Sequence, residues 1–313
     1  MIRIGSRGSA LARWQADHIA AALRDRGHQV SIEILVTTGD RVQHAPFVQV
    51  GTKGMFTKEI EEALADERID LAVHSLKDLP TELSEEFIIA AIPKRADARD
   101  AFVSVRHKKF AELPLGAVVG TSSLRRQAQL RALRSDLDIR ELRGNVDTRL
   151  RKLQEGQYDA IILAAAGVDR LGLAADVKEL FSPQQMCPAA GQGALAIECR
   201  TKDDATRAVV SALDDDSTHF AVQVERAALG TLGGGCHLPV GVYCEAINNG
   251  WALMGVVARP NGSQILREQM EFHQERSSAE DAGREMANRL LLRGAAEFLA
   301  ASETAPPAGN PVK

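Results

Sequence analysis

The chain of 313 residues is longer than one compact core usually supports, so we expect two or three domains. Its apolar content of 45% and charged content of 26% are typical of a globular protein. A net charge of −4 and an aromatic content of 4% argue against a nucleic-acid-binding protein, which usually combines a basic balance with stacking rings. No apolar run approaches a membrane span, and the first residues begin a strand rather than a signal peptide, so we expect a cytoplasmic protein.

Strands and helices alternate through most of the chain. Apolar alternation and short apolar runs predict strands at residues 1–4, 31–36, 69–73, 88–92, 101–105, 117–119, 139–142 and 160–163. Apolar stripes with a helical period predict helices at residues 10–24, 55–66, 123–133 and 148–154. This order is typical of parallel, doubly wound sheets, so we expect two α/β units side by side. A further strand at residues 194–199 is expected to return to the first unit.

The pattern changes after the second unit. A helix at residues 221–229 is followed by strands separated by Asn-Asn-Gly at residues 248–250 and Pro-Asn-Gly at residues 260–262, which are antiparallel hairpin signals. Ser277 and Glu280 are predicted to form the capping box of a last helix. The inward side chains of that helix are predicted to be Met286, Leu290, Leu291 and Phe298. We therefore expect a small α+β domain at this end of the chain.

The segment HSLKDLP at residues 74–80 follows the apolar strand at residues 69–73. Packing alone does not need His, Ser, Lys and Asp together, and the carboxyl ends of parallel strands are where ligands bind. Asp78 stands beside Lys77 and Pro80 stiffens the exit, so a carboxylate is held near a cation. Taken alone, the segment also fits an ordinary strand-end turn, because Asp, Ser and Pro are common turn residues.

Several strand-to-helix junctions combine Gly, Ser or Thr with a cation. These junctions lie at residues 5–9 with Arg7, 51–54 with Lys53, 121–123 with Arg125 and Arg126, 143–145 with Arg149, and 164–167 with Arg170. A cation in the first helical turn opposes the partial positive charge of the helix N-terminus, at a cost of roughly 0.3–1 kcal/mol. An anion bound to Arg125 and Arg126 would resolve that conflict. Each junction singly fits an ordinary cap with a solvated arginine, whereas all five on one edge of paired sheets favour a partly enclosed anion pocket.

The four cysteines, at residues 187, 199, 236 and 244, fit neither a zinc site nor a disulfide framework, and at least three are expected to be plain core or surface thiols. Cys236 differs because three glycines at residues 233–235 precede it. The glycines fit either a flexible hinge with an incidental thiol or a loop that presents Cys236 as a covalent attachment point. The second interpretation uses the nucleophilic character of the thiolate.

Seven motifs follow one another along the chain. They are GSRGSALA at residues 5–12, GTKGMFTKE at 51–59, HSLKDLP at 74–80, GTSSLRRQ at 120–127, LRGNV at 142–146, GQGA at 191–194 and GGGCHLP at 233–239. No single motif is diagnostic, but the ordered set is highly specific. With this set, the chain resembles the porphobilinogen deaminase (hydroxymethylbilane synthase) family up to about residue 300.

The resemblance implies two doubly wound α/β domains of the periplasmic-binding-protein type (type II), linked by hinge crossings, plus a small α+β C-terminal domain. The implied boundaries are residues 1–95 with 194–214 for domain 1, 96–193 for domain 2, 215–301 for domain 3 and 302–313 for a loose tail. The resemblance also implies a dipyrromethane cofactor attached to Cys236 as a thioether. The implied reaction in tetrapyrrole biosynthesis joins four porphobilinogen molecules head to tail with release of ammonia, and then frees hydroxymethylbilane by hydrolysis.

The same resemblance suggests roles for individual residues. Asp78 is the candidate catalytic carboxylate, which would stabilise the pyrrole nitrogens as positive charge develops and help to move protons. The substrate and cofactor are expected to be bound by Arg7, Ser9, Asp40, Lys53, Ser75, Lys77, Thr121, Ser122, Ser123, Arg125, Arg126, Arg143, Arg149, Arg170, Gln192 and Gly193, of which Gln192 and Gly193 would line the hinge side. No metal is expected. One departure is Gln49, which stands where several relatives have a lysine, and its expected effect is on affinity rather than on reaction type.

Two other classes of protein fit part of this pattern. A non-catalytic anion-binding protein explains the arginines and a hinge but leaves Cys236 and Asp78 without a task. An RNA-handling protein would use the arginine cluster, but the acidic balance and the few aromatic residues count against it. We expect a monomer that acts on a small-molecule substrate and has no nucleic-acid or membrane partner.

Overall fold

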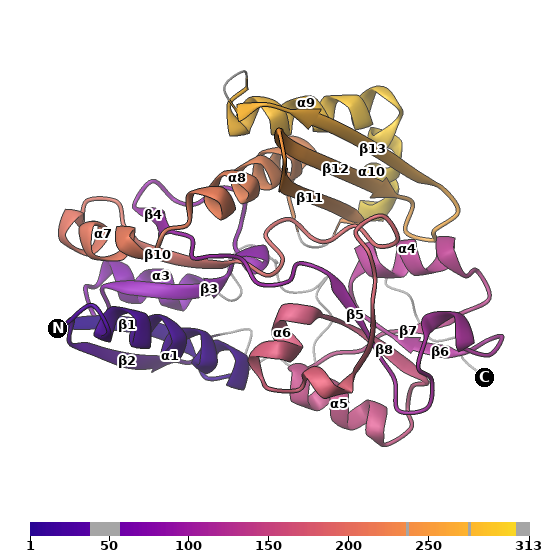
Figure 1. Cartoon of the computed structure of the whole chain (residues 1–313), viewed down its shortest axis with the longest axis horizontal. Helices are drawn as coiled ribbons and strands as arrows, with labels where there is room; N and C mark the ends of the chain where they lie inside the picture. Colours follow the sequence, from indigo (N-terminus) through magenta and orange to yellow (C-terminus); the bar gives the residue numbers. More distant parts are fainter. Residues whose placement is uncertain (38–56, 236–237, 275–276, 305–313) are drawn as a thin grey trace.

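The computed structural model describes residues 1–37, 57–235, 238–274 and 277–304. Its strands form three sheets, and we call the units built on them the first, second and third lobes (Figure 1). The first and second lobes lie side by side, and the third lies above them in this view. None of the helices within these ranges has the length and apolarity that a membrane crossing needs.

The first lobe contains a five-stranded sheet with the order β2-β1-β3-β10-β4. Its elements are β1 (Ile2–Arg7), α1 (Ala10–Arg24), β2 (Val30–Leu35), α3 (Lys58–Ala65), β3 (Leu71–Ser75), η2 (Leu76–Asp78), β4 (Phe87–Ala91), β10 (Leu195–Arg200), α7 (Asp204–Val210) and η5 (Ser211–Leu213). β1 pairs in parallel with β2 and β3, whereas β10 runs antiparallel between β3 and β4. The predicted return of this late strand to the first unit is confirmed.

The second lobe contains a sheet with the order β7-β6-β8-β5-β9. Its elements are β5 (Asp100–Val103), η3 (Phe110–Glu112), β6 (Val118–Gly120), α4 (Leu124–Leu133), β7 (Asp138–Arg140), α5 (Val146–Gln154), β8 (Ala160–Ala164), α6 (Ala165–Arg170), η4 (Ala174–Asp176) and β9 (Val177–Leu180). β9 was not predicted, because two of its four residues are Lys178 and Glu179 and the run is too short to show a period. Each sheet has one strand that runs antiparallel to both of its neighbours, β10 in the first lobe and β5 in the second. The predicted α/β class is therefore confirmed, with mixed rather than wholly parallel sheets.

The third lobe contains an antiparallel sheet of β11 (Val240–Ile247), β12 (Gly250–Ala258) and β13 (Ile265–Phe272). The helices α8 (Asp216–Thr231), α9 (Ala279–Leu292) and α10 (Ala295–Thr304) share one apolar core with this sheet. Met254 and Val256 pack instead against Cys187, which follows the second lobe in the chain. Both predicted hairpin turns are present, and the α+β character of this lobe is confirmed.

The predicted cap of α9 was wrong by one residue. Ser278, not Ser277, is the N-cap, and its hydroxyl accepts a hydrogen bond from the backbone N–H of Asp281 at 3.1 Å. Phe298 is buried as expected, but it belongs to α10, which begins after α9 has ended near Gly294. The expectation that at least three cysteines are plain thiols agrees with the burial of Cys187, Cys199 and Cys244.

Two crossings connect the first and second lobes. The chain passes out between β4 and β5 and returns between β9 and β10. The crossings touch where the backbone N–H of Ala96 donates to the carbonyl of Gly193 at 3.2 Å. Gly193 has a φ of +88°, and a Cβ there would lie 2.6 Å from the carbonyl oxygen of Ala96. Only glycine fits this close approach without displacing the opposite strand.

Candidate active site

The HSLKDLP segment lies where β3 ends near the second lobe. His74 turns to one side of the sheet, where its Nε2 lies 2.8 Å from a carboxylate oxygen of Glu198. Ser75 turns to the other side and accepts a hydrogen bond from the Gln15 side chain at 2.8 Å. The chain then tightens into η2, which carries Lys77 and the exposed Asp78. Because β3 ends at Ser75 and the tight turn of η2 follows at once, Ser75, Lys77 and Asp78 lie at the same end of the sheet.

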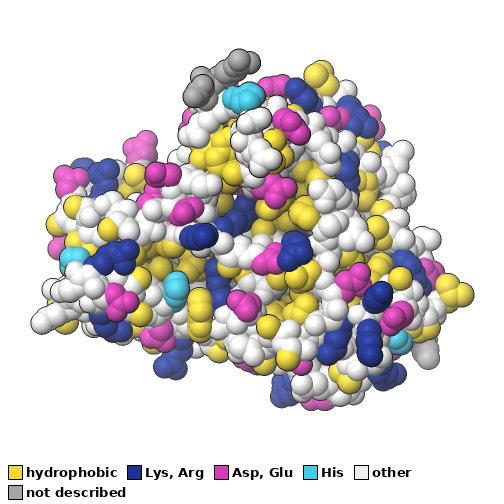
Figure 2. Space-filling view, in the orientation of Figure 1, with side chains coloured by type: hydrophobic (Ala, Val, Ile, Leu, Met, Phe, Trp, Pro, Cys, Tyr) yellow, Lys and Arg dark blue, Asp and Glu magenta, His cyan; other side chains and the backbone are white. Residues whose placement is uncertain are grey.

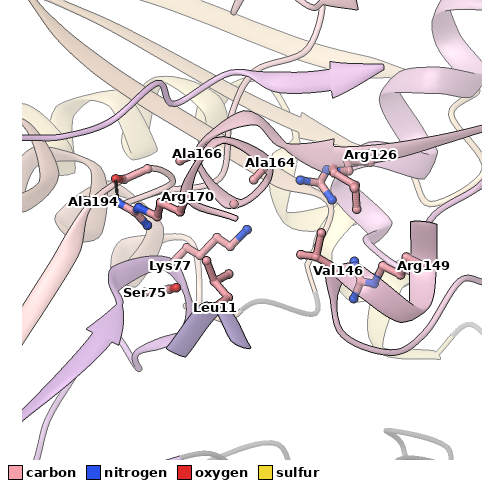
Figure 3. A pocket seen from close by; sticks show the side chains of 13 residues that line it. Leu11, Ser75, Lys77, Arg126, Val146, Arg149, Ala164, Ala166, Arg170 and Ala194 are labelled. Carbon is pink, nitrogen blue, oxygen red and sulfur yellow. Dashed lines mark hydrogen bonds between the residues drawn. The ribbon is translucent and has the colours of Figure 1, made fainter. Parts of the chain in front are cut away.

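A cavity lies between this strand end and the second lobe (Figure 3). Lys77 enters it from the first lobe, whereas Arg126, Arg149 and Arg170 come from the second. The other lining residues are Leu11, Ser75, Val146, Leu163, Ala164, Ala166, Gly167, Gly193 and Ala194. In the space-filling view, Lys and Arg side chains are visible near the middle of the face shown, where the lobes meet (Figure 2).

Two of the arginines in the cavity donate hydrogen bonds only to backbone carbonyls within the described residues, and the Arg170 guanidinium also lies over the Trp14 ring, 5.7 Å from its centroid. Arg149 donates from Nε to the carbonyl of Gly144 at 2.8 Å, and Arg170 donates from Nη2 to the carbonyl of Gly193 at 2.7 Å. Neither forms an ion pair with any described residue. A buried guanidinium without a counter-charge is unfavourable unless an anion reaches it.

The pKa values of these cations reflect that burial. Burial lowers the pKa of Lys77 to about 8; the nearby Asp78 carboxylate opposes this effect and the Arg126 charge adds to it. Burial also lowers the pKa of Arg149 to about 10, with repulsion from Arg126 in the same direction, and lowers the pKa of Arg170 to about 10. The Asp78 charge acts on the pKa values of Lys77, Arg126 and Arg149, so this carboxylate lies close to the cations of both lobes.

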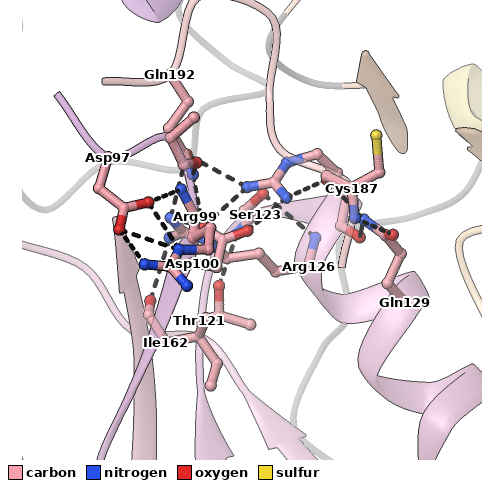
Figure 4. Close-up of polar contacts among 12 residues, drawn as sticks. Asp97, Arg99, Asp100, Thr121, Ser123, Arg126, Gln129, Ile162, Cys187 and Gln192 are labelled. Carbon is pink, nitrogen blue, oxygen red and sulfur yellow. Dashed lines mark hydrogen bonds and ion pairs between the residues drawn. The ribbon is translucent and has the colours of Figure 1, made fainter. Parts of the chain in front are cut away.

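Arg125 and Arg126 have an anion within the protein, the carboxylate of Asp100 (Figure 4). Arg125 reaches it at 2.6 Å and Arg126 at 2.7 Å, and all three side chains are buried. A bound ligand was expected to compensate these two helix-terminal arginines, whereas in the structure the Asp100 carboxylate does so. The pairing was missed because no local pattern links Asp100, at the start of an apolar strand, to α4; the two meet only where β5 and α4 pack.

Four predicted hydroxyl groups form bonds that organise the local backbone. Ser9 caps α1, and Ser123 caps α4 by accepting from the N–H of Arg126 at 3.4 Å. Thr121 accepts from the N–H of Ser123 at 3.3 Å, and Ser122 donates to the carbonyl of Leu142 at 2.7 Å. None of the four is among the residues that line the cavity in the described part of the chain.

The remaining predicted residues fall into three groups. Gln192 does not line the cavity but bonds to Asp100, and its neighbour Gly193 does line it. Arg143 pairs with Glu141 at 2.5 Å, and Arg7 is half-buried at the end of β1. Asp40, Gln49, Lys53 and Cys236 lie outside the described residues. The structure thus gathers Ser75, Lys77, Arg126, Arg149, Arg170 and Gly193 around one cavity, with Asp78 close by.

These features define a two-lobed α/β protein with a cationic cavity where the lobes meet, joined to an antiparallel third lobe. Two family models match the chain: "Porphobilinogen deaminase, dipyromethane cofactor binding domain" over residues 2–208 and "Porphobilinogen deaminase, C-terminal domain" over residues 219–292. A porphobilinogen deaminase of Thiobacillus denitrificans is 47% identical over 300 residues, which cover 95% of this chain and 97% of that protein. One of Nitratidesulfovibrio vulgaris is 47% identical over 302 residues, with 95% of each chain covered. The chain belongs to the porphobilinogen deaminase family.

Solved structures of periplasmic binding proteins are more distant. A periplasmic substrate-binding protein of an ABC transporter from Coxiella burnetii has a TM-score of 0.44 and 16% identity, and covers 70% of this chain and 94% of its own. A nutrient-binding protein from Burkholderia cenocepacia has a TM-score of 0.44 and 14% identity, and covers 70% of this chain and 93% of its own.

Proposed function

We propose that the cavity between the first and second lobes is the site at which this member of the family carries out its reaction. The chain is a transferase of tetrapyrrole biosynthesis that condenses porphobilinogen on a dipyrromethane cofactor. The observation that carries the proposal for the site is the meeting of Lys77 with Arg126, Arg149 and Arg170 around one cavity, beside the carboxylate of Asp78.

The donor set of the cavity fits a pyrrole chain with acidic side chains. Each porphobilinogen unit brings an acetate and a propionate, so the growing product brings several carboxylates. Arg149 and Arg170 donate only to carbonyls within the described chain, and each guanidinium has further N–H groups to offer. A carboxylate that binds them supplies the missing counter-charge and forms charge-assisted hydrogen bonds.

The dipyrromethane, when bound, supplies the free α-carbon to which the first substrate unit is joined. We propose that Cys236 carries it as a thioether. The positive φ values of Gly233, Gly234 and Gly235 support this assignment, because they give the chain before Cys236 a conformation that side chains rarely adopt. Cys187, Cys199 and Cys244 are poor alternatives, because they are buried and their thiol pKa values are raised, chiefly by that burial.

The reaction requires the site to accommodate a cation as well as carboxylates. Loss of ammonia from porphobilinogen leaves an azafulvene cation, the free α-carbon attacks it, and the new bond is completed when a proton leaves. A cavity lined only by cations would oppose that charge. We propose that the Asp78 carboxylate stabilises the pyrrole nitrogens at this stage and assists the proton transfers.

The finer assignments are also proposals. The proposed binding set is completed by Arg7, Ser9, Asp40, Lys53, Ser75, Thr121, Ser122, Ser123, Arg125, Arg143, Gln192 and Gly193. The return of β10 to the first sheet supports the proposed limits of 1–95 with 194–214 and of 96–193. The limits of 215–301 and of a loose tail at 302–313 are further proposals, although α10 extends to Thr304. We propose in addition a cytoplasmic monomer, which light scattering and cell fractionation would test.

The test is to incubate the purified protein with porphobilinogen while its consumption and the intact mass of the protein are followed. We expect consumption, and a starting mass that exceeds the sequence mass by two pyrrole units. Cys236→Ala should lose the excess, whereas the matched variant Cys199→Ala should retain it. A wild-type protein without the excess that leaves porphobilinogen unchanged would instead favour a non-catalytic anion-binding protein.

A further inference from the structure

Asp100, the first residue of β5, lies behind the cationic wall of the cavity. Its side chain has 0% exposure, and it does not line the cavity itself. Its two oxygens accept from Arg125 Nη1 at 2.6 Å and Nη2 at 3.3 Å, and from Arg126 Nε at 2.9 Å and Nη2 at 2.7 Å. One carboxylate therefore holds two adjacent guanidinium groups.

The two arginines are held differently. Arg125 donates from Nη1 to the carbonyl of Cys187 at 2.7 Å as well as to Asp100, and it does not line the cavity. Arg126 donates from Nη1 to the carbonyl of Ile162 at 3.1 Å, and it does line the cavity. The three bonds from Arg126 to Asp100 and Ile162, together with a longer contact of 3.5 Å from Nη2 to the side-chain oxygen of Gln192, fix the plane of the guanidinium. Among the described residues these contacts leave one N–H of Nη1, which can donate to a carboxylate in the cavity.

Asp100 is also held by the crossing between the lobes. Gln192 donates from Nε2 to Asp100 at 2.9 Å and to the carbonyl of Ala98 at 2.7 Å (Figure 4). Burial opposes ionisation of Asp100, but the charges of Arg125 and Arg126 outweigh it and hold the pKa of this carboxyl well below its usual range. The carboxylate is thus charged throughout the neutral range and located at the junction of β5, α4 and the returning crossing.

We propose that Asp100 is a positioning residue, which rests on the proposed function. Asp100 holds the Arg126 guanidinium so that its Nη1 faces a carboxylate of the pyrrole substrate, while Arg125 and Gln192 hold Asp100 in place. The alternative is that Asp100 only compensates buried charge. Removing one partner of a buried ion pair is destabilising in either case, so stability alone does not separate the two roles. Substrate binding does separate them, because only the positioning role acts through Arg126.

The experiment is a double-mutant cycle between Asp100→Asn and Arg126→Lys, measured on the KM and kcat for porphobilinogen in folded protein that carries its cofactor. We expect Asp100→Asn alone to raise KM about tenfold with a smaller change in kcat, which is the size of a lost charge-assisted hydrogen bond. In the Arg126→Lys background, where the fork is already absent, Asp100→Asn should change KM by less than about twofold. Asp97→Asn is the matched control, because the exposed Asp97 pairs with Arg99 in the same segment and should leave KM unchanged.

Two outcomes would overturn the proposal. One is an unchanged KM in folded, cofactor-bearing Asp100→Asn, whatever its melting temperature. The other is the same rise in KM in both backgrounds. If Asp100→Asn does not fold or lacks the cofactor, Gln192→Ala takes its place in the cycle, and the same two outcomes apply. This variant keeps every charge, and it removes the bond to Asp100 together with the 3.5 Å contacts from Arg125 and Arg126 to the Gln192 side-chain oxygen. A wild-type protein that does not consume porphobilinogen would contradict the proposed function instead, so the two failures are distinct.

Discussion

The two edges of the cavity are built from different chemical groups. The first-lobe edge, at the end of β3, carries the exposed carboxylate Asp78 and the amine of Lys77, whose pKa burial lowers to about 8. The second-lobe edge carries Arg126, Arg149 and Arg170, which keep their charge at any physiological pH even where burial lowers the pKa to about 10. The first edge therefore has an amine that loses its charge near pH 8, and the second has guanidinium groups that do not.

This difference suggests a division of labour between the lobes. A carboxylate suits the stabilisation of transient positive charge, whereas guanidinium groups suit the binding of carboxylates. We then expect Asp78 of the first edge to govern kcat and the cations of the second edge to govern KM. The two edges must lie close together for two pyrrole units to be joined, so the crossings between the lobes are expected to affect both kcat and KM.

The largest effect is expected from the first edge. Asp78→Asn keeps the shape of the side chain but removes the negative charge that we propose to offset the azafulvene cation. We expect kcat to fall by about 10³-fold or more, with the cofactor still attached, as shown by intact mass. A variant that retained most of its turnover would show that the carboxylate is not needed.

A smaller effect is expected from the second edge. Arg149→Gln removes a half-buried charge that we propose to bind substrate carboxylates, so KM for porphobilinogen should rise by about ten- to a hundredfold while kcat at saturation changes little. Arg151→Gln is the matched control, since Arg151 is exposed on the same helix and pairs only with Glu155 at 3.9 Å. A loss confined to kcat would remove the distinction between the edges.

The pH dependence of Lys77 gives a third, smaller effect. Its pKa of about 8 means that the amine is charged below that pH and neutral above it, so carboxylate binding should weaken as pH rises through 8. We expect kcat/KM to fall by up to about tenfold per pH unit above this value. In Lys77→Arg the fall should disappear or move to higher pH, and an unchanged profile in that variant would exclude Lys77 as its source.

At the crossing that joins the edges, the expected effect is measured as a loss of stability. Gly193→Ala would place a Cβ against the carbonyl of Ala96 in a left-handed conformation, so we expect a loss of about 1–3 kcal/mol in unfolding free energy. Gly172→Ala is the control, because Gly172 has a φ of +71° with nothing within 4 Å of its Cβ position. Equal losses in both variants would show that backbone strain alone, and not contact between the crossings, sets the cost.

Much of the fold could be predicted because the apolar period is strong where elements are long. The helix at 10–24 agrees with α1, and the strand at 194–199 was correctly assigned to the first sheet. β9 was missed because a short, partly polar strand shows no period. The cap at Ser278 was misplaced because two serines stand together, and only backbone geometry decides which one accepts from the helix.

The candidate site was predictable in composition but not in pairing. The junction motifs identified Arg126, Arg149 and Arg170, since cations at helix N-termini are unusual. The HSLKDLP segment identified Lys77. Asp100 was missed, because its distance from Arg125 depends on how β5 and α4 pack and not on any local pattern. Ser9 and Ser123 were expected to bind the ligand, and in the structure their hydroxyls cap α1 and α4. A serine just before a helix fits both roles, so the sequence alone does not separate ligand binding from capping.

The most direct test of the division between the edges is to count pyrrole units on the protein by intact mass after porphobilinogen is added at saturation. For Arg149→Gln we predict the same stepwise ladder of added pyrrole units as for the wild-type protein, because excess substrate overcomes weakened binding. For Asp78→Asn we predict that the mass stays at that of the cofactor-bearing protein, because the coupling itself is blocked. A ladder in Asp78→Asn, or a stalled Arg149→Gln at saturation, would contradict the account.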